Sequence, residues 1–285
     1  MMFEEKKLDI WSESYWNQIK RNIGILSENE QEILRNKEVA ILGVGGLGGP
    51  LSEQLVRIGC ENLLIYDNDI FTSSNLNRQI CTKEDLNKTK ISVTEKLLKK
   101  INPEVHIRKF SKLDELNISK ILENTSIVAL TLDDPLRSII IARECKKRNI
   151  PIIESFGIPY LWSWWFTRGS IDYENCYDFK TKNLKIQEIR KYEKDLLDIK
   201  RTILLKLLQF PGLIDIYNRK LKSMDGMLSG KLPFVTFAPI SRLTASYIAF
   251  DIIFSGILKI KKMNLAPNIL GYDYFRMKEI KFRIK

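Results

Sequence analysis

Histidine is nearly absent from this 285-residue sequence, which contains only His106. That residue sits in EVHIRKF, where apolar and polar residues alternate as in a strand. A structural role is the simpler interpretation of His106. A mechanism that needs a histidine base or a histidine-ligated metal is therefore disfavoured.

Cysteine is scarce as well, and the sequence has no long apolar run. The four cysteines form no CxxC pair and no disulfide framework: Cys60, Cys81, Cys145 and Cys176. This usage favours a reducing, cytoplasmic location. No run of 18 apolar residues is present, and the first residues carry acids, so we expect neither a membrane span nor a secretory signal.

The composition is that of an ordinary globular protein, with 44% hydrophobic and 28% charged residues. Its length allows one large domain or two small ones. The net charge is +11, but the lysines are spread along the chain beside glutamates, without a basic tail. We interpret most of them as a solvated surface and expect no nucleic-acid partner, while attraction to a nucleotide or an acidic peptide stays open.

Strand-like and helix-like segments alternate as far as about Gly157. Residues 13–36 read as helix, with a capping-box-like SENE at 27–30. Further strands are expected at 38–43, 62–67, around Val105, at 126–134 and at 150–157, with helices at 50–60, 88–102 and 135–149 between them. This order predicts an α/β fold: a doubly wound, mostly parallel sheet with a Rossmann-like nucleotide site.

The C-terminal half follows a different pattern and is expected to add helices and closing antiparallel strands. Residues 160–179 are aromatic and strand-like, and 184–210 are amphipathic and helical up to Pro211-Gly212. A buried helix is expected at 239–258, ending near Gly256, and the alternating tail at 268–285 predicts strands. We therefore divide the chain into residues 1–157 and 158–285, with a helical insertion at 182–232.

A glycine loop lies between the first strand and the helix that follows it. The segment GVGGLG, residues 43–48, fits GxGxxG and contains Gly43, Gly45, Gly46 and Gly48. Such glycines permit a tight turn and let backbone N–H groups approach a phosphate. Asp67 follows 19 residues after Gly48, at the end of the next strand, where a carboxylate can bind ribose hydroxyls.

Further charged and polar residues follow the same strand ends. Asn75, Arg78 and Gln79 come soon after Asp67, Lys90 lies twelve residues after Arg78, and Asp133 ends a later strand. Arginine and lysine suit phosphates, and aspartate suits Mg²⁺. An NAD(P)-dependent oxidoreductase has no use for so much positive charge. The set therefore indicates ATP with a metal ion.

Together the segments GVGGLG, DND, NLNRQ, DLNKTK and TLDD resemble the ThiF/MoeB superfamily of adenylating enzymes, which includes the ubiquitin-activating enzymes. The resemblance covers residues 15–160. It implies that a substrate carboxylate attacks the α-phosphate of ATP, giving an acyl-adenylate and pyrophosphate. In that scheme residues 1–157 form the ATP-binding adenylation core with an N-terminal helical arm, and residues 158–285 serve substrate binding and dimerisation.

The resemblance also implies roles for individual residues. The glycines line the phosphate loop, Asp67 binds the ribose with Asp69 nearby, and Asp133 holds Mg²⁺. Phosphate or nucleotide contacts fall to the remaining polar residues of the set: Asn75, Arg78, Gln79 and Lys90. Arg21, in IKRNIGILSENEQ, matches an arginine that reaches across a homodimer into the partner's ATP site.

The chain departs from many members of the superfamily at the structural zinc site. ENCYDF offers Cys176, but Phe179 stands at the second cysteine position and no cysteine follows. We expect no zinc, because a tetrahedral site needs four ligands. The same absence disfavours thioester or sulfur-transfer chemistry, and of the cysteines Cys176 is the least implausible nucleophile.

The second half resembles peptide-modifying members of the superfamily, those that mature microcin C and pantocin A. The resemblance lies in LPFVTFAPISRLTASYIAFDII and NILGYDYFRMKEIKF. A peptide groove would have to come from the 182–232 insertion and the Trp162, Trp164, Trp165 cluster, although core packing is the simpler interpretation of these tryptophans.

The leading hypothesis is ATP-dependent adenylation of a carboxylate on an acidic precursor peptide in natural-product maturation, by a homodimer. One alternative is activation of the C-terminal glycine of a small ubiquitin-like sulfur carrier in thiamin or molybdopterin biosynthesis. Another is a non-catalytic nucleotide-binding scaffold.

Overall fold

The computed structural model describes residues 10–159, 161–191, 202–203, 205–207, 213–217, 219 and 222–284. Its centre is a six-stranded sheet in the order β3-β2-β1-β4-β5-β6. The first five strands are parallel and β6 is antiparallel to β5. The strands are β1 (Glu38–Leu42), β2 (Asn62–Tyr66), β3 (His106–Phe110), β4 (Ile127–Leu130), β5 (Ile152–Glu154) and β6 (Trp164–Phe166).

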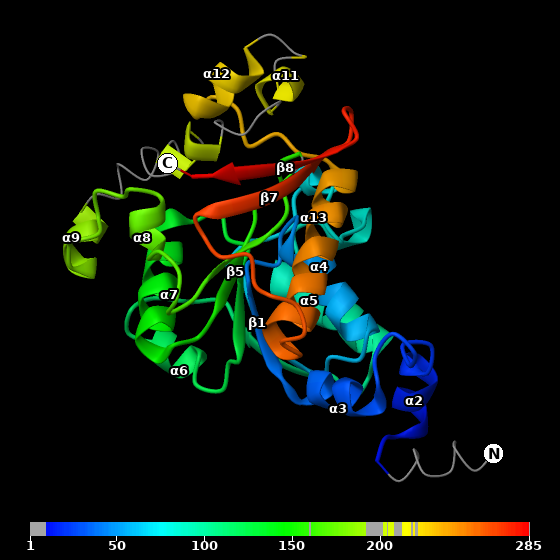
Figure 1. The fold of residues 1–285 in the computed structure, drawn as a ribbon. Helices are drawn as coiled ribbons and strands as arrows, with labels where there is room; N and C mark the ends of the chain where they lie inside the picture. Colours follow the sequence, from blue (N-terminus) through cyan, green and yellow to red (C-terminus); the bar gives the residue numbers. More distant parts are fainter. Residues whose placement is uncertain are drawn as a thin grey trace.

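Helices cover both faces of this sheet (Figure 1). One face carries α4 (Gly48–Arg57), α5 (Lys90–Ile101) and α13 (Ala238–Phe250), which continues as a π-helical segment, Asp251–Ile257. The other carries α6 (Ile118–Ile121), α7 (Pro135–Arg148), α8 (Tyr173–Cys176) and α9 (Ile186–Lys191). The predicted doubly wound α/β fold is therefore confirmed.

Strand alternation assigns each buried side chain to one of the two cores. In β1, Ile41 packs with α4 and α13, whereas its neighbour Leu42 packs with α7. Successive side chains of a strand point to opposite faces, and a sheet covered on both faces needs apolar residues at every position. That requirement explains the near-continuous apolar runs of β1, β2 and β4.

The N-terminal region differs from the single helix expected over residues 13–36. It consists of α2 (Glu13–Ile19) and α3 (Glu28–Asn36), with non-helical residues between them. Gly24 adopts a φ of 114° in that connection, and Ser27 and Glu30 form the expected capping box, which starts α3. The capping box therefore marked the break between the two helices, although the apolar periodicity continues across it.

Residues 160–179 are less strand-like than expected. Among the described residues 161–179 only β6 is a strand, and α8 follows it. Trp164 and Trp165 are fully buried on opposite faces of the sheet, so they belong to the core rather than to a groove. Trp162 is half-buried and its ring lies 4.8 Å from that of Tyr247.

The C-terminal strands form as expected. β7 (Asn268–Asp273) and β8 (Lys278–Arg283) pair as an antiparallel hairpin. Figure 1 shows this hairpin next to α11 (Leu213–Tyr217) and α12 (Ser223–Leu228). The helical stretch Ala238–Ile257 is long and apolar enough to cross a membrane, but 61% of it is buried in the protein, as in a core helix. The expected helix end at Pro211-Gly212 lies outside the described residues.

Candidate functional site

The glycine loop joins β1 to α4 at the carboxyl edge of the sheet. Gly43 has a φ of 103°, and a side chain there would meet the backbone of Thr131 at 2.7 Å. A side chain at Gly48 would lie 1.8 Å from the Gly43 carbonyl oxygen. The Thr131 hydroxyl donates to that same oxygen at 2.6 Å. These contacts require glycine at both positions and fix the loop at the N-terminus of α4.

Asp67 lies directly beside this loop, after β2. Its Oδ2 accepts a hydrogen bond from the Val44 N–H at 3.0 Å, and its Oδ1 accepts one from the Asp69 N–H at 2.9 Å. Burial raises the pKa of the Asp67 carboxyl, while Lys90 and the two backbone donors oppose that shift. The carboxylate is thereby held rigidly at the end of its strand.

Lys90, the first residue of α5, lies at the same strand end. Its Nζ donates to Asp69 Oδ2 at 2.8 Å and is 4.0 Å from Asp67 Oδ1. Lys90 is 7% exposed, whereas the Asp69 side chain is 60% exposed. The lysine assigned to phosphate is thus held between two carboxylates, of which Asp67 is buried and Asp69 is largely exposed.

The NLNRQ segment lies over the glycine loop. The Arg78 Nε would be 3.4 Å from a side chain placed on Gly46, so the arginine packs against the loop backbone. Its Nη1 donates to the Ser74 carbonyl and to Asn77 Oδ1. Gln79 is buried beside Gly45, and its Oε1 has no hydrogen-bond partner among the described residues. Arg78 therefore offers N–H donors to a ligand on the loop, and Gln79 offers an acceptor.

Asn75 makes a local contact. Its Oδ1 accepts a hydrogen bond from the Thr72 N–H at 3.0 Å and closes a short 3₁₀ turn, Ser73–Asn75. The side chain is 9% exposed. Asn75 shapes the segment that carries Arg78, and its Nδ2 group is left for other contacts.

Asp133 follows β4 and is exposed, and no hydrogen bond or ion pair joins it to another described residue. The next residue, Asp134, caps α7 by accepting from the Arg137 N–H at 2.9 Å. The two neighbouring carboxylates thus differ: Asp134 is committed to the helix, and Asp133 is available to a ligand.

Arg21 is not brought to this site within its own chain. The adjacent Asn22 donates to the Ile58 carbonyl at 3.1 Å, which places this segment at the C-terminal end of α4. The glycine loop is at the other end of that ten-residue helix, about 15 Å away. The Arg21 side chain is exposed, with no ion pair to a described residue.

Three residues of the site carried no assignment from the sequence: Thr131, Thr236 and Ser241. Thr131 holds the glycine loop, as described above. The Thr236 carbonyl accepts a hydrogen bond from Asn77 Nδ2 at 3.0 Å, which ties the segment before α13 to the NLNRQ segment. The proline in the first turn of α13 was the sequence signal that could have found Thr236 and Ser241. Proline there predicts the start of a helix, and Thr236 lies just before that start and Ser241 just after it.

Comparison with known proteins decides the family of the chain. The family model described as "ThiF family" matches residues 18–285. The chain belongs to the ThiF family. The molybdopterin-synthase adenylyltransferase of Haemophilus influenzae is 33% identical over 131 residues, which are 45% of this chain and 54% of the relative. The tRNA threonylcarbamoyladenosine dehydratase of Bacillus subtilis is 31% identical over 144 residues, 50% and 57% of the two chains.

This ThiF-family chain thus spans about half the length of these curated relatives. Among solved structures, E. coli MccB with ATP has a TM-score of 0.63 at 22% identity, covering 90% of this chain and 66% of that chain. PaaA has a TM-score of 0.66 at 20% identity, covering 97% and 85%. At these identities the likeness establishes a shared fold, including the C-terminal half.

The segment around Cys176, where the sequence was compared with a zinc site, lies in an aromatic cluster of this ThiF-family chain. Cys176 and Phe179 are both buried, and the rings of Tyr177 and Phe179 stack 5.5 Å apart. Burial raises the pKa of the Cys176 thiol to about 12, which makes it a poor nucleophile. Among the described residues, no group of three or more metal-ligating side chains comes together.

Glu154, at the end of β5, is buried in that aromatic cluster. It accepts hydrogen bonds from Tyr173 at 2.9 Å and from Tyr177 at 2.5 Å. Burial raises its pKa to about 7, although the two hydroxyl donors favour the charged form. The carboxyl group therefore titrates near neutral pH inside the core.

We expect Glu154 to make the unfolding free energy fall as the pH rises. The unfolded-state pKa is about 4.3, so between that value and about 7 the folded chain binds the extra proton. The stabilisation is complete below the unfolded pKa and is lost as the pH passes through the folded value. Urea titrations at pH 5 and pH 8 should show wild type losing about 2–3 kcal/mol relative to Glu154→Gln, which cannot ionise. Parallel pH profiles for the two proteins would contradict this titration.

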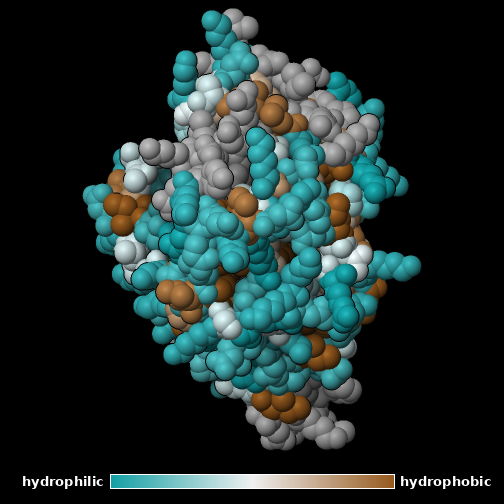
Figure 2. All heavy atoms as spheres, turned by 90° about the vertical axis from the view of Figure 1, so that its left-hand side faces the viewer, coloured by the Kyte–Doolittle hydropathy of each residue, from teal (hydrophilic) through white to brown (hydrophobic). Residues whose placement is uncertain are grey.

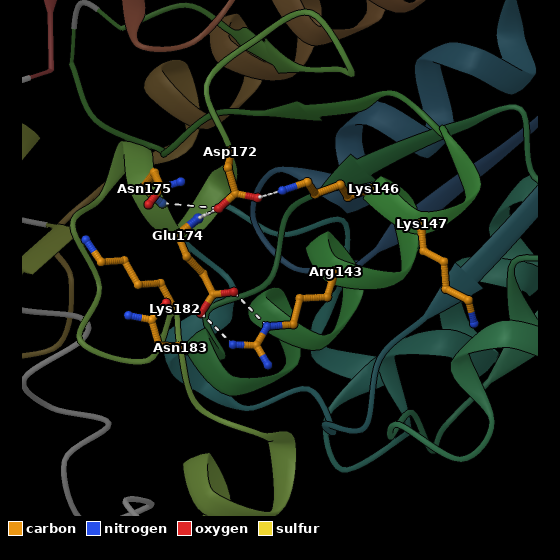
Figure 3. A pocket seen from close by; sticks show the side chains of 8 residues that line it. All are labelled: Arg143, Lys146, Lys147, Asp172, Glu174, Asn175, Lys182 and Asn183. Carbon is orange, nitrogen blue, oxygen red and sulfur yellow. Dashed lines mark hydrogen bonds and ion pairs between the residues drawn. The ribbon is translucent and has the colours of Figure 1, made fainter.

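A surface hollow of about 600 Å³ lies on the face formed by α7 and α8, away from the glycine loop (Figure 3). Figure 2 shows that this side of the molecule is largely hydrophilic. Within the hollow, Arg143 forms two bonds to Glu174 and also donates to the Leu184 and Thr181 carbonyls, and Lys146 pairs with Asp172. These groups fasten the α8 region to α7, and four of the five guanidinium N–H donors of Arg143 are used in doing so.

Proposed function

We propose that this chain is an ATP-dependent adenylyltransferase that activates a carboxylate. The observation that carries the proposal is the convergence on one glycine loop of a rigid carboxylate, Asp67, an arginine, Arg78, and a free carboxylate, Asp133. The buried amide oxygen of Gln79 adds a polar group that no other described residue pairs with. The named adenylyltransferase among the relatives supports the same activity.

Each residue then has a definite task. The loop from Gly43 to Gly48 receives the phosphates, because side-chain-free backbone and the N-terminus of α4 favour an anion. Asp67 receives ribose hydroxyls, and Arg78 turns from its carbonyl partners to a phosphate. Lys90 neutralises Asp67 and Asp69 and approaches the phosphates when Asp69 turns away. Asn75 supports Arg78 and contributes its amide, and Gln79 contacts the nucleotide.

Asp133 fits a magnesium ligand. Mg²⁺ in such sites is held by one or two carboxylates together with substrate phosphates, so a lone exposed carboxylate beside the loop is sufficient. When bound, the ion would neutralise charge that develops on the pyrophosphate. Asp133 would hold it at the carboxyl edge of β4.

The reaction balances without an acid or a base from the protein. An ionised substrate carboxylate forms a bond to the α-phosphorus, and the bond from that phosphorus to the bridging oxygen of pyrophosphate breaks. Pyrophosphate leaves with the electron pair. The chain's contribution is to align the reacting atoms and to stabilise charge, which agrees with a site that has cations and no histidine.

Arg21 acts in a second copy of the chain in this proposal. Arg21 is too far from the glycine loop of its own chain to contact a nucleotide there. In a homodimer it would reach the ATP site of the partner. Residues 158–285 and the insertion at 182–232 would then provide substrate binding and part of the dimer contact, with residues 1–157 as the ATP-binding core.

The proposed substrate is an acidic precursor peptide. The net charge of +11 favours a substrate that carries negative charge. The buried, unreactive thiol of Cys176 supports a route that needs no thioester. The fold shared with MccB, which was solved with MccA, supports the same choice. A small sulfur-carrier protein is the alternative, supported by the molybdopterin-synthase relative.

ATP–pyrophosphate exchange tests the activity and the substrate class together. We expect exchange to rise at least tenfold above the substrate-free rate with acidic peptides of the proposed class. Stimulation only by a carrier protein ending in Gly-Gly would transfer the assignment to the alternative. ATP binding without exchange for either would favour a scaffold, and failure to bind ATP would end the adenylation proposal.

A further inference from the structure

Two buried hydroxyl groups beside the glycine loop have no hydrogen-bond partner among the residues that the structure describes: Oγ of Ser241 and Oγ1 of Thr236. Ser241 lies in the first turn of α13 and is 1% exposed, and Thr236 precedes that helix by two residues. A buried hydroxyl left without a partner destabilises the folded state, because it has lost its hydrogen bonds to water. Two of them in one place call for a partner that the described part of the chain does not supply.

Gly157, after β5, leaves a space in front of both hydroxyls. A methyl group on Gly157 would lie 3.4 Å from Thr236 Oγ1 and 3.9 Å from Ser241 Oγ. The Gly157 backbone is not in the left-handed region, so its conformation does not demand glycine. What glycine provides here is room for about one heavy atom, next to two hydrogen-bond donors.

This space adjoins the phosphate-binding loop. Leu47, which precedes α4, is the third neighbour of the same methyl position, at 3.8 Å. The Thr236 carbonyl is held by Asn77 in the segment that carries Arg78. The N-terminus of α13 also points here, and its partial positive charge favours an anion.

We propose that this space binds one oxygen of the substrate carboxylate, which accepts hydrogen bonds from Ser241 and Thr236. The inference rests on the adenylation proposed above and adds the acyl subsite to it. The second carboxylate oxygen is left unbound and attacks the α-phosphorus. Neutral hydroxyl donors suit this task, because an arginine would pair with both oxygens and reduce their nucleophilicity.

The probe for this subsite is 5′-O-(N-propionylsulfamoyl)adenosine, compared with 5′-O-sulfamoyladenosine. The sulfonyl group stands for the α-phosphoryl group, and the propionyl carbonyl oxygen stands for the bound carboxylate oxygen. The ratio of the two dissociation constants, measured by calorimetry, isolates the contribution of the acyl group and requires no knowledge of the natural substrate.

We expect wild type to bind the propionyl compound more tightly than the unacylated one. Gly157→Ala fills the space, and Ser241→Ala removes a donor, so each should reduce that preference about tenfold. Affinity for 5′-O-sulfamoyladenosine should stay within about twofold, because neither change touches the nucleotide. The methyl contacts of Gly157→Ala are of ordinary length, so the variant should fold, which a thermal melt checks.

Matched controls come from the same chain. Ser246, on α13, donates to the Arg242 carbonyl and does not face the space at Gly157. Gly169 is exposed. Ser246→Ala and Gly169→Ala should therefore bind both ligands as wild type does. An unchanged preference in Gly157→Ala and Ser241→Ala, or equal losses for both ligands, would overturn the subsite while leaving adenylation standing. Wild type that bound neither ligand would overturn both proposals.

Discussion

Asp133→Asn should lower ATP–pyrophosphate exchange by about 10²–10³-fold, because it removes the carboxylate proposed to hold the metal ion on the phosphates. Its side chain is exposed and joined to no other described residue, so the fold does not depend on it. The free energy of unfolding should therefore change by less than about 0.5 kcal/mol. Exchange assays and urea titrations on the same preparation measure the two quantities.

The matched control for this change is Asp178→Asn. Asp178 is also exposed, and its closest charged contact is Lys182 at 3.5 Å, far from the glycine loop in the α8 region. This variant should exchange pyrophosphate as fast as wild type. Equal exchange rates for Asp133→Asn and wild type across a magnesium titration would show that Asp133 does not hold the ion.

Arg21→Ala should reduce exchange by about 10²-fold, even though Arg21 lies at the far end of α4 from its own glycine loop. The physical reason is charge: a guanidinium supplied by the second chain would stabilise the triphosphate and the departing pyrophosphate. Arg57→Ala is the control, since Arg57 is an exposed arginine at the same end of α4 whose one ion pair with a described residue is to Glu53.

A mixed dimer distinguishes action across the interface from action within one chain. Co-expression of Arg21→Ala and Asp133→Asn with two affinity tags gives dimers in which one site keeps both residues if Arg21 acts in the partner. Such dimers should show about half of wild-type activity, whereas each parent variant is nearly inactive. A mixed dimer as inactive as its parents would mean that Arg21 does not serve the partner's site.

Local sequence patterns predicted the parts of the fold that depend on short-range interactions. The strand, glycine loop and helix at residues 38–57 form as expected, since apolar runs and glycines act within a few residues. The single helix over 13–36 was wrong: periodicity continued across Gly24, but the capping box at Ser27 begins a second helix. The capping box is a more local signal than hydrophobic periodicity, and here it decided where the helix begins.

The surroundings of the charged residues followed only from the three-dimensional arrangement. Lys90 was assigned to phosphate, yet the end of β2 places Asp67 and Asp69 around its ammonium group. Trp164 and Trp165 could line a groove or fill a core, and the position of β6 beside β5 buries them both. Such outcomes depend on which strands become neighbours.

The sequence by itself determined that a glycine loop would stand at the carboxyl edge of a parallel sheet, because hydrophobic periodicity and glycine sterics are local. Tertiary structure alone decided that the unpaired hydroxyls of Thr236 and Ser241 would face Gly157. These two residues come some eighty positions after Gly157 in the chain. Tertiary structure also decided that Arg21 would lie at the opposite edge from the glycine loop. These placements come from packing α13 and α4 on one face of the sheet, a long-range choice that no short stretch of residues encodes.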